Sequence, residues 1–360
     1  MSVSSIRVAT LAAAACVAAP VAATPIDGLQ LMRELNLIVL GDASTRHDVE
    51  GKSYVQGNLT GSGNYNIGGG GNQTASNRPV LTVGGDISGG WKNVQGGGTI
   101  LAGGNVSQVN LNGGTYTVRA GGSITGNQNQ NRFEANADVD IPMFGDTFSD
   151  LSLQLAALAD TGGSTSLNGQ TAVVNPAAGV NGVAVFNLGD VSQLLSGGGH
   201  IISSVAFGKD ADLMDTIVMN VGGTSFSFDD NFLGGGNFAT QDNIAENVIW
   251  NFYEATTLNF NREFFGSILA PLARVTNQNA INGTVVAKSA ALNGEVHLGT
   301  YQGTQLTFSD PVPPPGGFIP PEESPSGEVP APGALGLLAL ALIGFAAVRR
   351  RRSSETPVAA

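Results

Sequence analysis

The chain has 360 residues, 51 of them glycine, and its 28 acidic and 16 basic residues give a formal net charge of −12 at pH 7. An acidic surface repels nucleic acid and anionic lipid headgroups, so the charge argues against a DNA-binding role. The glycines are interleaved with Val, Ile and Leu, which favours a glycine-rich folded sheet over a disordered linker.

The first residues have the pattern of an export signal. Arg7 precedes an apolar, alanine-rich run from Val8 to Val21, and small residues lead to Ala23. This predicts a signal peptide over 1–23, cut after Ala23. Lipoprotein processing before Cys16 is the alternative, although it would leave a very short apolar run. Cys16 is the sole cysteine, so the exported chain is expected to have no disulfide and no thiolate site.

A short helix is expected around Gly28 to Leu35, and a glycine-marked phrase then recurs along the chain. The phrase is VGGDI at 83–87, AGGNV at 102–106 and AGGSI at 120–124, with offsets of 19 and 18 residues. VQGNL at 55–59 resembles it one longer step earlier. A repeat of this length is typical of one solenoid coil, which buries its apolar side against its neighbours.

The middle of the chain departs from this period. Asp150 is placed to cap a helix with Leu151, Leu155 and Leu158 on one face, and Gly162 is placed to end it. This helix and the one near residue 28 are expected to cover the side or end of the β structure.

Strand-like runs follow at 184–186, 200–202 and 216–219, and they predict an inserted set of strands or hairpins within 184–228. The repeat then resumes, since GSILA at 266–270 matches GTVVA at 283–287 with an offset of 17. Asn-Gly pairs supply turn residues, as in hairpins; they begin at Asn112, Asn168, Asn181, Asn282 and Asn293.

The predicted fold class is therefore mainly β: a right-handed parallel β-helix or solenoid with an inserted strand region and one or two covering helices. The predicted organisation is a signal peptide at 1–23, an ectodomain at 24–309, a Pro-rich acidic spacer at 310–328, a sorting and anchor segment at 329–352 and a cytoplasmic tail at 353–360.

The C-terminal segment has the pattern of a temporary membrane anchor. An apolar run from Ala334 to Val348 is followed by four arginines, which resist translocation and should stay cytoplasmic. The run is short for a permanent span, which takes about 20 apolar residues. The residues that define this signal are Val329, Pro330 and Pro332, then Arg349, Arg350, Arg351 and Arg352.

This segment resembles the PEP-CTERM sorting signal, although Ala331 stands where that signal usually has glutamate. The resemblance implies an exosortase-type sorting enzyme as partner, a transient inner-membrane anchor, and a final place at the cell surface or outside a Gram-negative bacterium that makes exopolysaccharide.

The domain resembles the choice-of-anchor A family over roughly residues 26–305. LIVLGD at 37–42, DVEG at 48–51, VIWNFYEAT at 248–256 and FGSILAP at 265–271 carry the likeness. The resemblance implies surface display and adhesion or matrix association. The C-terminal half also looks like the ice-binding β-helix family, which uses a similar Gly-x-Ile-Leu-Ala phrase.

Few residues suggest a site. Asp42, His47 and Asp48 are candidates for a cation site if their loop folds back, with an ordinary polar turn as the alternative. Trp91, set between Gly90 and Lys92, is the candidate exposed aromatic for a ligand. Trp250 and Phe252 alternate onto one strand face and are expected in the core.

No metal-binding histidine spacing and no nucleophile motif is present in the sequence, and no cofactor is expected. The leading hypothesis is a non-enzymatic structural or adhesive protein associated with an extracellular glycan, matrix polymer or biofilm. A β-helix polysaccharide lyase or hydrolase is the first alternative. An ice-associating protein is the second, and Thr115-x-Thr117 is the one clear Thr-x-Thr in the repeat region.

Overall fold

The structure is a computed structural model that describes residues 27–68, 71–125, 132–189, 204–229, 244–306 and 308. All of them belong to the compact unit Met1–Phe308. The predicted signal peptide with Cys16 and Ala23, the strand run at 200–202, the spacer and the sorting segment with its arginines lie outside the described residues.

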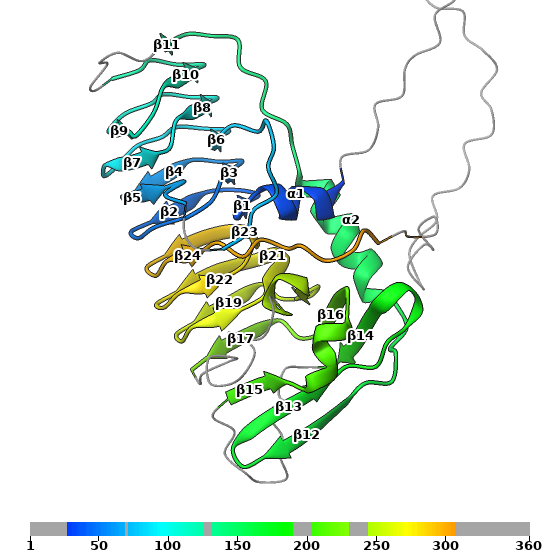
Figure 1. Ribbon diagram of the computed structural model, residues 1–360. Coiled ribbons are helices and arrows are strands. Elements are labelled where there is room, and N and C mark those ends of the chain that lie inside the picture. The colour runs from blue at the N-terminus through cyan, green and yellow to red at the C-terminus, as the bar shows by residue number, and fades with distance from the viewer. Residues whose placement is uncertain are drawn as a thin grey trace, which may run out of the picture. The chain divides into compact units, whose positions relative to one another are not determined.

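The main architecture is a stack of parallel coils with three faces (Figure 1). The first face is one long sheet, part of which two helices cover, and we call it the helix-covered face. In stacking order its strands are β11 (Arg132–Glu134), β10 (Tyr116–Ala120), β8 (Gly98–Ala102), β6 (Leu81–Val83), β3 (Ser53–Val55), β1 (Leu37–Val39), β23 (Val285–Leu292), β21 (Ser267–Asn277), β18 (Val248–Asn251), β16 (Thr216–Val221) and β14 (Val183–Leu188).

The second face contains the C-terminal parts of β21 and β23 together with four further strands, β17 (Ser225–Phe228), β19 (Thr257–Phe260), β2 (Ala43–Thr45) and β4 (Leu59–Gly61). Single bridges extend it from Leu59 through Ile87 and Val106 to Ile124. The third face consists of β20 (Phe264–Phe265), β22 (Ile281–Asn282), β24 (Val296–His297), β5 (Gly63–Tyr65), β7 (Lys92–Gln95) and β9 (Val109–Asn112), with Val49 bridging its two halves.

The chain enters this stack in the middle rather than at an end. β1 pairs with β23, so the first coil lies against the last one. The N-terminal coils continue to β11, and α2 then runs beside the stack toward β14 at the other end. From there the C-terminal coils return to β23. The two repeat regions, far apart in sequence, thus meet at a seam between β1 and β23.

The predicted parallel β-helix is confirmed, and the glycine-marked phrases are successive coils. Val55 pairs with Val83, Val83 with Ala102, and Ala102 with Ala120. The two later phrases, at 266–270 and 283–287, are neighbours in β21 and β23. The phrase needs glycine because the next coil approaches so closely: a Cβ on Gly84 or Gly103 would collide with a backbone carbonyl of the adjacent coil.

Both predicted helices are present, but the second has different ends. α1 spans Gly28–Glu34 and is capped by Asp27, whose carboxylate accepts from the amide of Leu29 at 2.9 Å. α2 spans Gly145–Ala156, so the predicted start at Asp150 and stop at Gly162 are wrong. The reason is Phe148, which is fully buried and extends the apolar stripe of Leu151 and Leu155 back by one turn.

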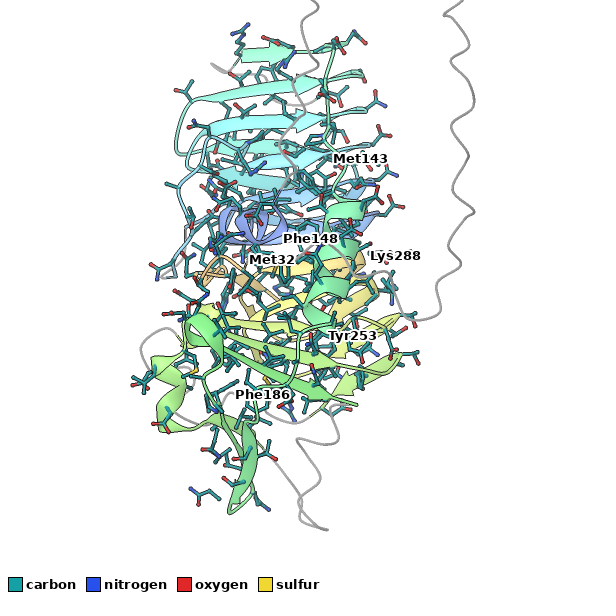
Figure 2. All side chains as sticks on the ribbon, turned by 90° about the vertical axis from the view of Figure 1, so that its right-hand side faces the viewer. Met32, Met143, Phe148, Phe186, Tyr253 and Lys288 are labelled. Atoms are coloured by element: carbon teal, nitrogen blue, oxygen red, sulfur yellow. The ribbon has the colours of Figure 1, made fainter. Side chains whose placement is uncertain are left out.

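The two helices and the sheet share a second apolar layer outside the coils (Figure 2). Phe148 of α2 and Met32 of α1 pack there against outward-facing sheet residues such as Ile249 and Val286. Asn220 and Asn251 donate to the carbonyls of Leu155 and Ser152, which ties α2 to the sheet. One face of α2 is therefore fixed along the coils.

The predicted inserted strands are only partly separate. β12 (Ser164–Asn168), β13 (Thr171–Asn175) and β15 (Ser204–Phe207) form their own small sheet, in which β12 and β13 are antiparallel. β14 and β16, expected within the insertion, instead join the long parallel sheet. Their sequences are apolar on both faces because coils bury one side and α2 covers the other. Short 3-10 turns lie at Val180–Gly182, Lys209–Leu213 and Ile244–Asn247.

The interior of the coils is continuous and changes character along the stack. Aliphatic columns dominate the N-terminal coils, whereas the C-terminal coils enclose aromatic rings. Phe228 and Phe260 stack in parallel with ring centroids 4.8 Å apart, and Trp250 donates from Nε1 to the carbonyl of Phe265 at 3.0 Å. Trp250 and Phe252 are fully buried, as predicted.

Candidate functional site

A column of Asp and Asn side chains lies at the edge of the second face. Four of its members are the polar residues of the glycine phrases, one per coil: Asn58, Asp86, Asn105 and Ser123. The fifth is Asp42, which follows Gly41 and lies opposite Asn58. The Oδ1 atom of Asp42 accepts from the backbone amide of Asn58 at 2.7 Å and from its Nδ2 at 3.1 Å. Asp86 binds Asn105 in the same way, at 2.6 and 3.1 Å. Each coil is thereby locked to the next.

A second column, two residues further along each coil, presents small side chains to solvent. Register pairs Ser44 with Thr60 and with Ala291, and the bridges place the others in line. In stacking order this column is Ser227, Asn259, Thr276, Ala291, Ser44, Thr60, Ser88, Ser107 and Thr125. Adjacent members are about 4.8 Å apart, the spacing of hydrogen-bonded strands.

The hydroxyl groups of this column are oriented by the fold. Thr60 donates to the carbonyl of Ala43 at 3.3 Å, and Ser107 donates to the carbonyl of Ile87 at 3.1 Å. A hydroxyl has a single proton, so these oxygens have only their lone pairs left for a ligand. Within the described part of the second face, the surface is consequently rich in hydrogen-bond acceptors.

The two columns line an open groove of about 550 Å³ beside the seam. Its lining consists of Asp42, Ala43, Ser44, Asn58, Thr60, Asp86, Ser88, Arg274, Ser289, Ala290 and Ala291. The N-terminal coils supply the first seven residues and the C-terminal coils the last four, so the groove exists only because the chain closes on itself at the seam.

Three charged side chains recur at every second coil of the first column. Arg274 pairs in register with Ser289, and Ser289 lies opposite Asp42 because the next residues, Ala290 and Ala43, are paired. Asn58 then separates Asp42 from Asp86. Among the described residues, Arg274 forms no ion pair. The groove is lined by carboxylates, hydroxyls, an amide and a guanidinium, all of which can bind a polar ligand.

Trp91 lies at the corner that follows the groove, and 45% of its surface is exposed. It does not line the groove. The next residue, Lys92, is fully buried and points its ammonium into the corner, where Nζ donates to the carbonyls of Gly61 at 2.8 Å and Gly90 at 2.9 Å and to that of Ser88. Burial lowers the pKa of Lys92 to about 8.

The three residues suggested for a cation site serve different parts of the fold. Asp42 binds Asn58 on the second face, whereas Asp48 accepts from Nδ2 of Asn64 at 2.6 Å on the third face. His47 lies exposed in the turn between them. The part of the chain that the structure describes holds no group of three or more His, Cys, Asp or Glu side chains able to bind a metal ion.

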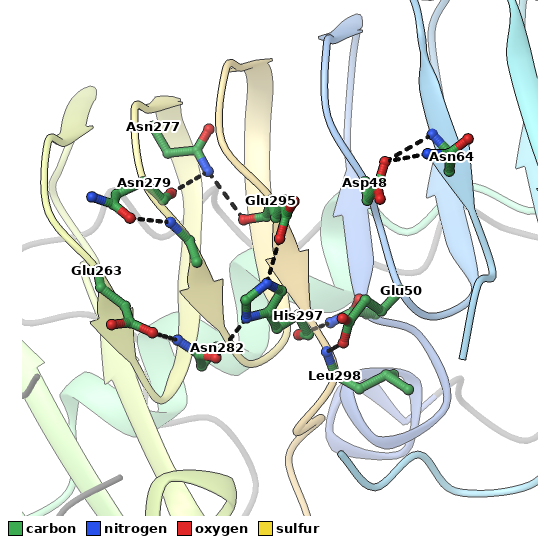
Figure 3. A network of polar contacts seen from close by, with 12 residues as sticks. Asp48, Glu50, Asn64, Glu263, Asn277, Asn279, Asn282, Glu295, His297 and Leu298 are labelled. Carbon is green, nitrogen blue, oxygen red and sulfur yellow. Dashed lines mark hydrogen bonds and ion pairs between the residues drawn. The ribbon is translucent and has the colours of Figure 1, made fainter. Parts of the chain in front are cut away.

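A polar network surrounds the seam on the third face (Figure 3). The imidazole of His297 contacts Oδ1 of Asn282 at 3.0 Å and Oε2 of Glu295 at 2.6 Å. Glu50, from the N-terminal coils, accepts from the amide of Leu298 at 2.7 Å. The network therefore joins both halves of the stack.

The sequence singled out Asp42 as a candidate cation ligand and gave no indication of most of the groove. Ser44, Thr60 and Ser88 are ordinary polar residues in sequence, although each follows its coil's Asp or Asn by two positions, which could have marked them. Arg274 and Ser289 had no such mark, because they reach the groove only through pairing across the seam.

Neither helix in the described residues is long and apolar enough to cross a membrane. Stacked parallel coils, a helical cover and an open acceptor-rich groove define a β-solenoid domain built to present a polar surface.

The chain belongs to the family described as "Putative Ice-binding-like adhesive domain", whose model matches residues 28–298. A second model, the PEP-CTERM protein-sorting motif, matches residues 328–352. Together they confirm the adhesive-family resemblance and the sorting signal. They point to an exported, cell-surface protein that an exosortase-type sorting system recognises.

No curated protein matches the chain. Among solved structures, an ice-binding protein 1 domain from Shewanella frigidimarina is similar at 13% identity, covering 77% of this chain and 96% of that one, with a TM-score of 0.25.

Proposed function

We propose that this protein is a non-enzymatic adhesin whose second face binds an extracellular glycan or matrix polymer such as that of a biofilm. The groove carries the proposal: residues of several coils line it, among them the carboxylates of Asp42 and Asp86 and the acceptor hydroxyl of Thr60. Such a surface makes many weak polar contacts with a polymer. Because the coils are preorganised, ordering the site adds little entropic cost, and many copies on one cell would raise avidity.

The described C-terminus of the domain supports display of this face. Leu306 and Phe308 pack against the apolar layer shared with the helices, so the last described residues of the domain lie on the helix-covered face and not in the groove. We further propose cleavage of a signal peptide after Ala23, transient inner-membrane anchoring through 334–348 in a Gram-negative cell, and sorting of the adhesin by an exosortase.

A glycan array combined with a cell-attachment assay tests the proposed adhesive function. We expect the purified protein to bind extended polysaccharides, and cells that display it to attach better to polysaccharide-coated surfaces than cells lacking it. Absence of glycan binding together with detectable polysaccharide cleavage would overturn the proposal in favour of a lyase or hydrolase.

One observation favours ice association as a second candidate. The hydroxyl column from Ser44 to Thr125 repeats at the strand spacing, and regular hydroxyl rows are suited to ordering water. The column beside these hydroxyls carries three charged residues, Asp42, Asp86 and Arg274, so the face as a whole is not a uniform row of hydroxyl groups. Thermal hysteresis and shaped ice crystals with the purified protein would favour this candidate. Loss of both effects in Thr60→Val would place the ice-binding surface on the hydroxyl column.

A further inference from the structure

The groove has a charge pattern whose period is two coils. Asp42 and Asp86 flank Asn58 in the same column, so their carboxylates are about 10 Å apart along the stack, twice the strand spacing. This separation is close to the length of one disaccharide in an extended sugar chain. A polysaccharide that runs across the strands would therefore meet the carboxylates of Asp42 and Asp86 at two positions that are two sugars apart.

Both carboxylates keep one oxygen available. In each, the hydrogen bonds with described residues use Oδ1, and none among the described residues reaches Oδ2. Asp42 is exposed and Asp86 half-buried. Thr60 lies between them in the neighbouring column, and its hydroxyl proton is donated to the carbonyl of Ala43. The stretch from Asp42 to Asp86 thus offers acceptors and negative charge, which a ligand carrying several donors and positive charge would complement.

We propose that this groove binds an extended polysaccharide of amino sugars along the solenoid axis, with ammonium groups paired to Asp42 and Asp86. The proposal rests on the glycan-binding function above and names its substrate class. The acidic chain as a whole attracts such a polycation. Arg274, two coils beyond Asp42, repels ammonium and sets the end of the stretch that binds ammonium groups.

Asparagine is the matched replacement for both acids, because Asn58 and Asn105 already occupy equivalent positions of the same column. Asp42→Asn/Asp86→Asn removes two charges and keeps the Oδ1 acceptors that join the coils. The control is Asp140→Asn/Asp212→Asn, which removes the same charge from two exposed residues outside the groove. Equal melting temperatures would show that all three proteins remain folded.

The test is calorimetric titration of the full chain with a glucosamine hexasaccharide and its fully N-acetylated counterpart, at 0.15 M salt to screen distant charges. We expect the amino form to bind more tightly, and Asp42→Asn/Asp86→Asn to weaken it roughly tenfold, as two partly exposed ion pairs allow. The control should bind like the wild type. Arg274→Gln should bind more tightly than the wild type, which a purely structural role for this column would not produce.

Equal affinity for the two hexasaccharides, unchanged in Asp42→Asn/Asp86→Asn, would overturn the amino-sugar assignment and leave glycan adhesion standing. Weakening of equal size in the control would also overturn it, because general charge attraction would then explain the binding. Failure of the proposed function has a different signature: no glycan of any class binds, and cells displaying the protein gain no attachment.

Discussion

At the residue scale, the phrase glycines are required by the close approach of neighbouring coils. Gly103→Ala would drive a methyl group into the carbonyl of Gly84, and we expect a loss of about 1–3 kcal/mol in the free energy of unfolding, as for other overpacked sites. Urea unfolding measures it. Gly145→Ala is the control, because no atom lies within 4 Å of its added Cβ; a similar loss there would contradict the explanation.

Lys92 makes stability depend on pH. Its pKa is about 8 in the folded protein and 10.5 in an unfolded chain, so between these values the unfolded state holds the extra proton and stability rises with pH. Urea unfolding between pH 7.5 and 10 should show the wild type gaining stability relative to Lys92→Met, in which this group cannot titrate. A difference in unfolding free energy between the two proteins that stays constant across that range would show that burial does not lower the pKa of Lys92.

At the element scale, α2 is held by one apolar stripe. Leu155→Ala should cost about 2–5 kcal/mol, since Leu155 is fully buried beneath the helix. Leu153→Ala, on the same helix but 60% exposed, should stay within about 0.5 kcal/mol of the wild type. Chemical denaturation compares the two, and equal losses would mean that α2 is oriented differently.

The same helix shows what sequence could and could not predict. The spacing of Leu151 and Leu155 predicts its buried face. The sequence favours a start at Asp150, because a polar capping residue is a stronger local signal for a helix start than an apolar residue such as Phe148. The coils were predictable because every phrase repeats its glycines and polar residue locally. The groove was not, since Arg274 and Ser289 reach Asp42 only through pairing of β2 with β23, residues more than 200 positions apart.

At the scale of the whole molecule, the seam should make both halves of the stack fold as one. Asn36 is fully buried there: Nδ2 donates to the carbonyls of Gly283 and His297, each at 2.9 Å, and Oδ1 accepts from the amide of Gly51 at 3.0 Å. Asn36→Ala leaves these groups unpaired, and we expect a loss of about 3 kcal/mol within a single cooperative transition.

Circular dichroism and tryptophan fluorescence followed together during unfolding test this coupling, since Trp250 and Trp91 report on opposite sides of the seam. Asn77→Ala, an exposed asparagine, is the control and should unfold like the wild type. Two separated transitions in wild-type protein would contradict a seam that unites the halves.

The most direct measurement of the central claim is attachment to matrix polysaccharide by cells that display variants of the protein in which larger side chains fill the groove. Ser44→Gln/Thr60→Gln adds two long neutral side chains inside the groove, and Ser225→Gln/Ser227→Gln adds the same to the second face outside its lining. We expect the first variant to lose attachment and the second to retain it at equal surface amounts. Undiminished attachment by the first variant would contradict the account.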